Sequence, residues 1–597
     1  MDSGSEVLIS KLRICHSERS EESLLKSRSS GKGTRNNKDP GGRYMRVTRK
    51  MMNDNSIYNI NANKEYMDKV NTQMATQKKF VDPSDDPITA IRALRFQSNL
   101  SEVTQFLDRN VSDAISWTES TQTSIDTARE LMRSLKSEYT SAANGTNEIK
   151  DLRIYYQDMK NLVDEYYSIG NASSEDRHIF TGYRTQDSLT FTDADFENRQ
   201  SSVQNGKYQY VGIKETFELE DLESYSFTVY KDTGTSGITD DQINDLHTSY
   251  INNVNETKVI SLENMYRMRL SYENLDKNQT DYAITYKDKD GKEITTDVLK
   301  LQITDSSTTP PTSLWSGTVE QISSDLDLIG ELTADNELPD DKIYLNTTTG
   351  NLIFGKKVQA ELSEQMSKAK TNDNIEISFQ YNKSEWLKGD VKPEYYFNCV
   401  DIGMGNTDDK RILYNDHEQA MNYHMGDSQD LKVNANACDV FTLDARRDLD
   451  EIYDYLNLMD SAQSKVDRLT EMKNNTTRYS SDEDQRTIQD LLAAANKELE
   501  YALKRVNEAF SAGITRSGKY FDFVNMAGTE MGTAVKRLEL IKTRLTEDKT
   551  TVQTQTSNNE NIDLSTLTVD LSEATLSYNA ALQVTGKISQ QTLVSFI

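Results

Sequence analysis

The chain has 597 residues, and 96 Asp and Glu against 68 Lys and Arg give it a formal net charge of -28. This acidity argues against a nucleic-acid partner, because phosphates attract a basic protein face. No apolar run reaches the length of about eighteen residues that a membrane-spanning helix needs, so we expect no membrane segment.

Three cysteines, Cys15, Cys399 and Cys438, are too few and odd in number for a disulfide framework. A bridge between Cys399 and Cys438 and two independently buried thiols are both compatible with the sequence, and we favour the thiols.

Residues 1–44 differ from everything that follows. They are rich in Ser, Gly and Asn and lack an apolar period, so we expect a disordered leader. Residues 7–14 are interrupted by polar side chains and do not form the apolar core of a signal peptide. A second hypothesis is that this leader is not native. Gly41-Gly42-Arg43 can be encoded by a ribosome-binding stretch, and the native protein would then start at Met45.

An apolar stripe predicts a first helix before a proline-containing corner. The stripe includes Ile60, Met67, Val70 and Met74. In Asp82-Pro83-Ser84-Asp85-Asp86-Pro87, both prolines force the residue before them out of the helical region. Asp85 or Asp86 is expected to cap the second helix, with Pro87 at its first position. The alternative, a metal site at these acids, is less favoured because a helix start itself attracts negative charge.

The longest regular pattern covers residues 88–139 without Gly or Pro. Its seam alternates steps of four and three, which is the period of about 3.5 residues that keeps one stripe against a partner helix. The seam comprises Leu107, Val111, Ala114, Thr118, Thr121, Ile125, Ala128, Met132, Leu135 and Tyr139. Another helix at about 149–169 follows a short connection and should therefore pack antiparallel to the first. Strand-like pieces at 178–183 and 188–192 follow it.

Residues 184–430 change from a helical to an alternating pattern, with turn sequences between short apolar runs. We expect one or two exposed, β-rich domains here, with a few helices such as 242–252 and 357–370. From about residue 444, separate helices are predicted over 449–469, 488–510, 531–552 and 564–588. Their stripes contain Val535, Leu538, Leu545, Leu564, Leu567, Leu571, Tyr578, Ala581 and Ile588, and the apolar end adds Leu593 and Phe596.

The predicted fold is therefore mostly α with a β-rich insert. Residues 45–183 and 431–597 share the helical period and should form one long antiparallel bundle, into which residues 184–430 are inserted. Contacts are expected between residues 114–135 and the helix at 531–552.

Two sets of motifs resemble the flagellin superfamily, most closely the family of hook-associated protein 3, which forms the hook–filament junction. One set is Lys79 to Pro87 followed by Ala90-Ile91-Arg92-Ala93-Leu94-Arg95, with Asn171 and Ile179-Phe180-Thr181-Gly182 downstream. The other is Ser557 to Leu564, Tyr578-Asn579-Ala580-Ala581-Leu582-Gln583 and the terminal Leu-x-x-Phe. The resemblance covers residues 45–183 and 444–597, whereas the insert resembles nothing familiar and residues 513–528 depart from the family's Arg-rich pattern.

The resemblance implies a structural, non-enzymatic protein of the bacterial flagellum, located outside the cell and exported without a cleaved signal peptide. It implies a homo-oligomeric ring whose partners are the first hook-associated protein, flagellin and an export chaperone at the C-terminal helix, with no cofactor. Filament flagellin is the first alternative, and a secreted adhesin or enzyme carried by the insert is the second.

Two stretches of the sequence resemble metal-binding motifs but lack a required ligand. His417-Glu418 begins like a zinc-protease helix, but Met421 stands where the second ligand is required, so surface histidines are favoured over a site with His424. Residues 288–291 resemble a calcium loop, but Tyr286 occupies the first ligand position, which favours a hairpin turn. The sequence thus predicts neither a metal nor a nucleophile–base set.

Overall fold

The computed structural model describes residues 49–145, 147–199, 210–230, 259–280, 283–287, 293–307, 312–332, 337–372, 374–401, 419–426 and 429–594. The expected leader with Met45, the helix at 242–252, the turn at 288–291, His417 and Phe596 lie outside the described residues. The chain divides into two compact units, Met1–Ala90 with Glu560–Ile597, and Ile91–Asn559.

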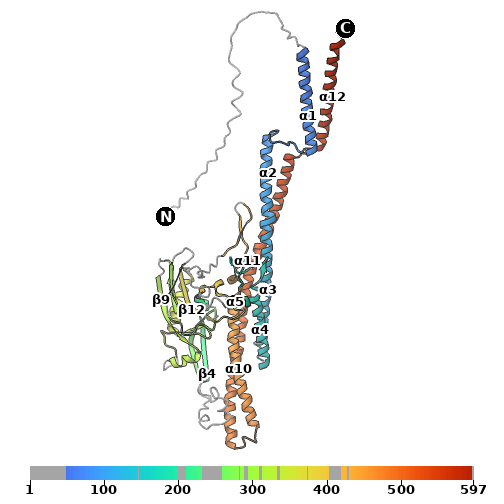
Figure 1. Cartoon of the computed structure of the whole chain (residues 1–597). Coiled ribbons are helices and arrows are strands. Elements are labelled where there is room, and N and C mark those ends of the chain that lie inside the picture. Colours follow the sequence, from blue (N-terminus) through green and yellow to red (C-terminus); the bar gives the residue numbers. More distant parts are fainter. Residues whose placement is uncertain are drawn as a thin grey trace, which may run out of the picture. The chain divides into compact units, whose positions relative to one another are not determined.

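The first unit is a pair of antiparallel helices, α1 (Arg49–Thr76) and α12 (Leu564–Val594), which lie side by side in Figure 1. Asn63 Nδ2 donates to Ser577 O at 3.4 Å along the pair. At its other end, Ile562 N donates to Gln77 O at 3.2 Å, and Lys78 Nζ forms an ion pair with Glu560 at 2.8 Å. The two ends of the chain therefore meet in one helix pair, as the shared period predicted.

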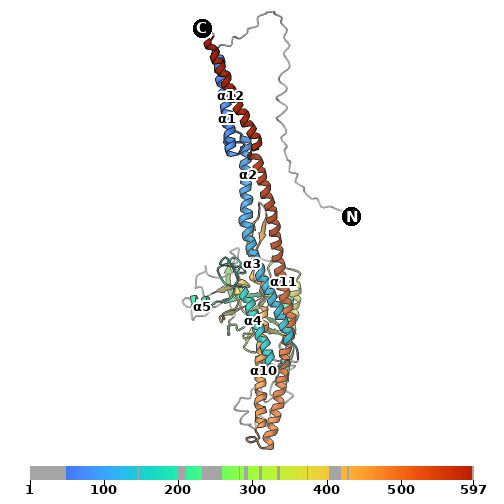
Figure 2. The ribbon, with the colours of Figure 1, turned by 90° about the vertical axis from the view of Figure 1, so that its right-hand side faces the viewer.

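The helical part of the second unit consists of four long elements, which Figures 1 and 2 show alongside one another. α2 (Pro87–Gln105) is followed by the π-helical segment η1 (Phe106–Val111) and by α3 (Ser112–Ala142). The others are α4 (Ile149–Ile169), α10 (Asp444–Asn474) and α11 (Asp482–Glu560). The expectation of separate helices over 488–510 and 531–552 is wrong, because α11 is one helix of 79 residues.

α3 and α11 run antiparallel in close contact. A Cβ atom added to Gly513 would lie 2.2 Å from the ring of Tyr139, and one added to Gly528 would lie 3.3 Å from Ile125. Lys549 forms an ion pair with Asp108 at 3.1 Å further along. A Cβ added to Gly532 would lie 3.8 Å from Gln122, so contact between residues 114–135 and the start of 531–552 is confirmed. Gly518 already approaches Lys136, so the stretch of α11 that faces residues 114–135 begins earlier than expected, near Gly518.

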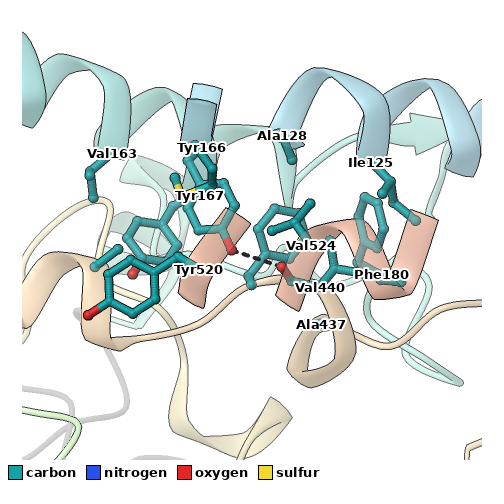
Figure 3. Close-up of a cluster of buried hydrophobic side chains, with 14 of the residues drawn as sticks. Ile125, Ala128, Val163, Tyr166, Tyr167, Phe180, Ala437, Val440, Tyr520 and Val524 are labelled. Carbon is teal, nitrogen blue, oxygen red and sulfur yellow. Dashed lines mark hydrogen bonds between the residues drawn. The ribbon is translucent and has the colours of Figure 1, made fainter. Parts of the chain in front are cut away.

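Figure 3 shows the core where α3, α4 and α11 meet the chain before α10. Ile125 and Ala128 of α3 are fully buried there with Tyr166 of α4 and Val524 of α11. The phenol of Tyr166 donates to Val440 O at 2.8 Å, which satisfies the one polar atom that this ring brings into the core.

The β-rich part of the second unit is built on one nine-stranded sheet, here called the insert sheet, with the order β13-β3-β12-β8-β9-β10-β11-β5-β4. Its strands are β3 (Tyr210–Thr216), β4 (Glu223–Tyr230), β5 (Val259–Arg269), β8 (Lys300–Asp305), β9 (Thr312–Ile322), β10 (Ile343–Asn346), β11 (Asn351–Phe354), β12 (Ile375–Lys383) and β13 (Asn398–Asp401). Neighbours are antiparallel except β9 and β10, which run parallel. α8 (Lys356–Ala369) buries Val358, Leu362 and Met366, so the helix expected at 357–370 is confirmed.

The remaining elements are short. The hairpins are β1 (Ser173–Ser174) with β2 (Arg177–His178), β6 (Ala283–Lys287) with β7 (Glu293–Asp297), and β14 (Asn422–His424) with β15 (Asp430–Lys432). The short helices are α5 (Asp193–Arg199), η3 (Leu219–Asp221), η4 (Asp325–Glu331), η5 (Pro393–Tyr395) and α9 (Ala437–Val440). The strands expected at 178–183 and 188–192 are wrong, because β2 ends at His178 and Thr190 makes only an isolated bridge to Val391.

The predicted fold class, helical ends with a β-rich insert, is confirmed. Cys399 and Cys438 are both free thiols. Within the described residues, no helix is both long and apolar enough to cross a bilayer.

Candidate assembly surfaces

The proline-containing corner starts α2 with an Asp cap. Oδ1 of Asp86 accepts hydrogen bonds from the backbone N–H groups of Ile88 and Thr89, both at 3.2 Å. Pro87 is the first helical residue, where its missing N–H costs nothing. Oδ2 of Asp85 instead accepts from the N–H groups of Val81 and Asp82 at 3.4 Å, inside the turn that contains Pro83. The carboxylates of Asp85 and Asp86 thus bind backbone donors.

Replacing Asp86 by Ala should cost about 1 kcal/mol of local stability, because two N–H groups at the helix start lose their acceptor. Hydrogen exchange at Ile88 and Thr89 is the measurement, and these amides should exchange faster. Asp82→Ala is the control, because its exposed carboxylate makes no hydrogen bond with the described residues. Equal exchange rates in the two variants would contradict the assignment of the cap.

In the first unit, the predicted seam is only partly closed. Val70 and Leu567 are buried, and Leu564 is exposed. Half-buried seam positions are Ile60, Met67, Met74, Leu571, Tyr578 and Ala581. The side chains of Ile588, Leu593 and Phe596 lie outside the described residues. Each helix of this pair therefore buries only a narrow stripe within its own chain.

Large apolar side chains remain exposed on both helices of this pair. Tyr58 of α1 is 70% exposed and Leu576 of α12 is 71% exposed. Ile57, Tyr66, Val569, Leu582 and Val584 are also exposed. Several large apolar side chains exposed on one helix pair are typical of an interaction surface, and we call this set the open apolar face of α1 and α12.

In the second unit the predicted seam is closed. Its fully buried members are Val111, Ala114, Ile125, Ala128, Met132, Leu135 and Leu538, with Leu545 also buried. Leu107 and Val535 are half-buried. This part of the bundle therefore needs no second chain to cover its stripe.

A buried ion network, which the sequence reasoning missed, joins the insert sheet to α10 and α11. Asp448 of α10 accepts from Arg269 Nη1 at 2.6 Å, Arg516 Nη1 at 2.9 Å and the phenol of Tyr520 at 2.6 Å. One turn along the helix, Glu451 accepts from Arg267 Nη1 at 3.0 Å. The only sequence signal is that charged residues occupy inward positions of a strand and a helix.

The electrostatics of the network follow from burial and from its three guanidinium groups. Burial alone would raise the pKa of Glu451, but Arg267, Arg269 and Arg516 lower that pKa to about 2. Glu451 is therefore ionised at neutral pH, and each charge of the network depends on its partners.

Of His417 and His424, the structure describes His424. His424 lies on the strand β14, where its exposed ring contacts Asp430, so the surface position favoured from the sequence is confirmed for this residue. His417 lies outside the described residues. Within the described ranges, no group of three or more His, Cys, Asp or Glu is arranged to hold a metal ion.

The N-terminal helices of this chain match a known protein family model. Residues 47–185 match the family model described as bacterial flagellin N-terminal helical region. This part of the chain is similar to the N-terminal helical region of bacterial flagellin. This region spans α1, the corner, α2, α3 and α4, and so includes both the open apolar face on α1 and the closed seam of α3.

Two curated relatives bear the name flagellar hook-associated protein 3. The one from Escherichia coli is 30% identical over 209 residues, which cover 34% of this chain and 58% of that protein. The one from Salmonella typhimurium is 30% identical over 146 residues, which cover 24% of this chain and 45% of that protein. The chain thus spans about half the length of the curated relatives it matches. A crystal structure of Xanthomonas campestris FlgL aligns with 77% of this chain and 99% of that chain at 10% identity and a TM-score of 0.23.

Proposed function

We propose that this chain is a structural component of the bacterial flagellum, a hook-associated junction protein that connects hook to filament and has no enzymatic activity. The observation that carries the proposal is the flagellin N-terminal helical region together with two relatives named flagellar hook-associated protein 3. In this role the protein acts outside the cell, where it arrives through flagellar export without a cleaved signal peptide.

The open apolar face of α1 and α12 supports an assembly role. The α1–α12 pair has Ser, Thr and Asn between its apolar residues and covers only part of its own stripe. Burying one large apolar side chain is worth about 1.5–3 kcal/mol, so neighbouring subunits that cover Tyr58 and Leu576 would stabilise the pair considerably. The proposed partners are further copies of this chain in a ring, the first hook-associated protein and flagellin.

The same face explains why an export chaperone at the C-terminal helix belongs to the proposal. Before assembly, exposed apolar side chains such as Leu576 and Leu582 would favour non-specific association in the cell. A chaperone that binds α12 would cover them until export.

Leu576→Asp should abolish stable incorporation of the protein at the hook–filament boundary. Leu576 is 71% exposed, so the change should leave the α1–α12 pair folded while it places an unpaired charge in the interface between subunits. The measurements are localisation of the protein in isolated flagella and swimming motility.

Thr575→Asp is the matched control, because it adds the same charge at the adjacent exposed position of α12. It should retain at least most of the wild-type incorporation. Normal motility with normal amounts of the Leu576→Asp protein at the junction would count against α12 as an assembly element, and its presence along the whole filament would favour flagellin instead.

A further inference from the structure

A cavity of about 490 Å³ lies between the insert sheet and the helices α10 and α11. Its size is that of a site for a small organic molecule. Its walls combine aromatic and aliphatic side chains, namely Tyr225, Tyr455, Leu458 and Tyr501, with a set of carboxylates and amides. The flagellar role proposed above makes no use of this cavity.

Three carboxylates of the cavity lie near one guanidinium group, that of Arg447, which pairs with only two of them. Asp450 and Asp454 lie one turn apart on α10, and Glu273 follows β5. Arg447 approaches Glu273 at 3.4 Å and Asp450 at 3.7 Å. Asp454 makes no hydrogen bond or ion pair with any residue in the described ranges, so negative charge is in excess here.

The pKa of Asp450 reflects both its burial and this excess of negative charge. Burial and then the neighbouring charge of Glu273 raise the pKa of Asp450 to about 7, although Arg447 opposes both effects. A cation brought between these carboxylates would stabilise their ionised forms.

Asp325, another carboxylate of the cavity, accepts hydrogen bonds from the phenol of Tyr225 and from Asn346 Nδ2. The remaining charged groups are paired with opposite charges. Arg267 is paired with Glu451 at 3.0 Å, and Arg269 is paired with Asp448 at 2.6 Å. Glu498 is paired with Lys465 at 2.7 Å. These arginines therefore do not neutralise the three carboxylates.

Independently of charge, two buried polar atoms of lining residues lack a hydrogen-bond partner among the described residues. Asn351 lines the cavity and is only 6% exposed, and its Oδ1 is buried without a hydrogen-bond partner among the described residues. The buried Oγ1 of Thr349, another lining residue, has no partner in the described part of the chain either. A buried acceptor left unpaired costs free energy, and a bound donor would recover it.

We propose that this cavity binds a small organic cation, a diamine or polyamine whose primary ammonium groups donate to Asp450, Asp454 and Asn351. An ammonium group offers three donors and no acceptor, which matches a site rich in unpaired acceptors. The methylene chain would lie against the tyrosines, whose faces also attract cations. A bare metal ion fits less well, because no metal-binding group of side chains occurs in the described residues.

The test is calorimetric titration of the full chain with cadaverine and with spermidine at constant ionic strength. Saturable binding at one molecule per chain is expected, with no heat from the neutral analogue 1,5-pentanediol. Asp454→Asn should weaken binding about tenfold or more, since it removes a charge-assisted hydrogen bond. Asn351→Ala should also weaken it, whereas the heat of binding should be unaffected by magnesium at the same ionic strength.

Glu471→Gln is the matched control. It also removes one charge from an exposed position of α10, but Glu471 does not line the cavity. The control is needed because a protein of net charge -28 attracts any polycation weakly. Absence of saturable binding, equal weakening by Asp454→Asn and Glu471→Gln, or competition by magnesium at similar concentration would each overturn the proposal.

Discussion

Asp448→Ala is expected to lower the free energy of unfolding by about 3–5 kcal/mol, the usual cost of removing one partner from a buried ion pair. Asp448 is 2% exposed and accepts from Arg269, Arg516 and Tyr520. Without it, two guanidinium groups remain in a low-dielectric site with too few acceptors, and the phenol loses its partner. Because Arg269 ends β5 and Arg516 lies on α11, the loss should loosen the insert sheet from the helices.

Urea unfolding followed by tryptophan fluorescence measures this effect, because Trp386 is buried in the core of the insert. Asp460→Ala is the control. Asp460 lies on the same helix and also pairs with an arginine, Arg153, but both side chains of that pair are more than a third exposed. An exposed pair contributes about 0–1 kcal/mol, so equal losses in the two variants would refute the role assigned to the network.

The sequence predicted those elements whose apolar residues recur with a regular period. A stripe of four- and three-residue steps in α3 reports one buried face, and Ile125, Met132 and Leu135 are indeed fully buried. The alternation of residues 184–430 similarly indicated strands, because one side chain in two faces a core. The corner at Asp86 and Pro87 was predictable because capping depends on residues adjacent in the sequence.

Features that depend on distant residues were not predictable in the same way. The partners of Asp448 come from β5 and α11, far away in the chain, and nothing in its own neighbourhood specifies them. The cavity at Asp450 and Asn351 likewise forms only when α10 meets the insert sheet. In both places, charged or amide side chains that would normally face water lie against another element.

The continuity of α11 also depends on contacts with residues that are distant in the sequence. Separate helices were predicted over 488–510 and 531–552 from two apolar stripes. Gly513, Gly518 and Gly528 lie between them and lower helix propensity. In the structure these glycines face α3, and the absence of a side chain lets the two helices approach. Tertiary contact therefore outweighs local propensity.

Gly513→Ala is accordingly expected to destabilise the protein, although alanine is the better helix former by about 0.8–1 kcal/mol. A Cβ at this position would lie 2.2 Å from the ring of Tyr139, which is fully buried and has Phe510 as an edge-on neighbour at 6.5 Å. The ring has little room to move, so α3 and α11 must separate locally, and such overpacking costs about 1–3 kcal/mol.

Gly532→Ala is the matched control on the same helix. Its new Cβ would meet only the side-chain oxygen of Gln122, at an ordinary contact distance of 3.8 Å. This variant should therefore be more stable than the wild type by roughly 0.5–1 kcal/mol, through helix propensity alone. Midpoints of thermal and urea unfolding compare the two variants, and α-helix content by circular dichroism should stay the same in both. If Gly513→Ala stabilised the protein as much as Gly532→Ala, the α3–α11 contact would not depend on the missing side chain, and the continuity of α11 would need another explanation.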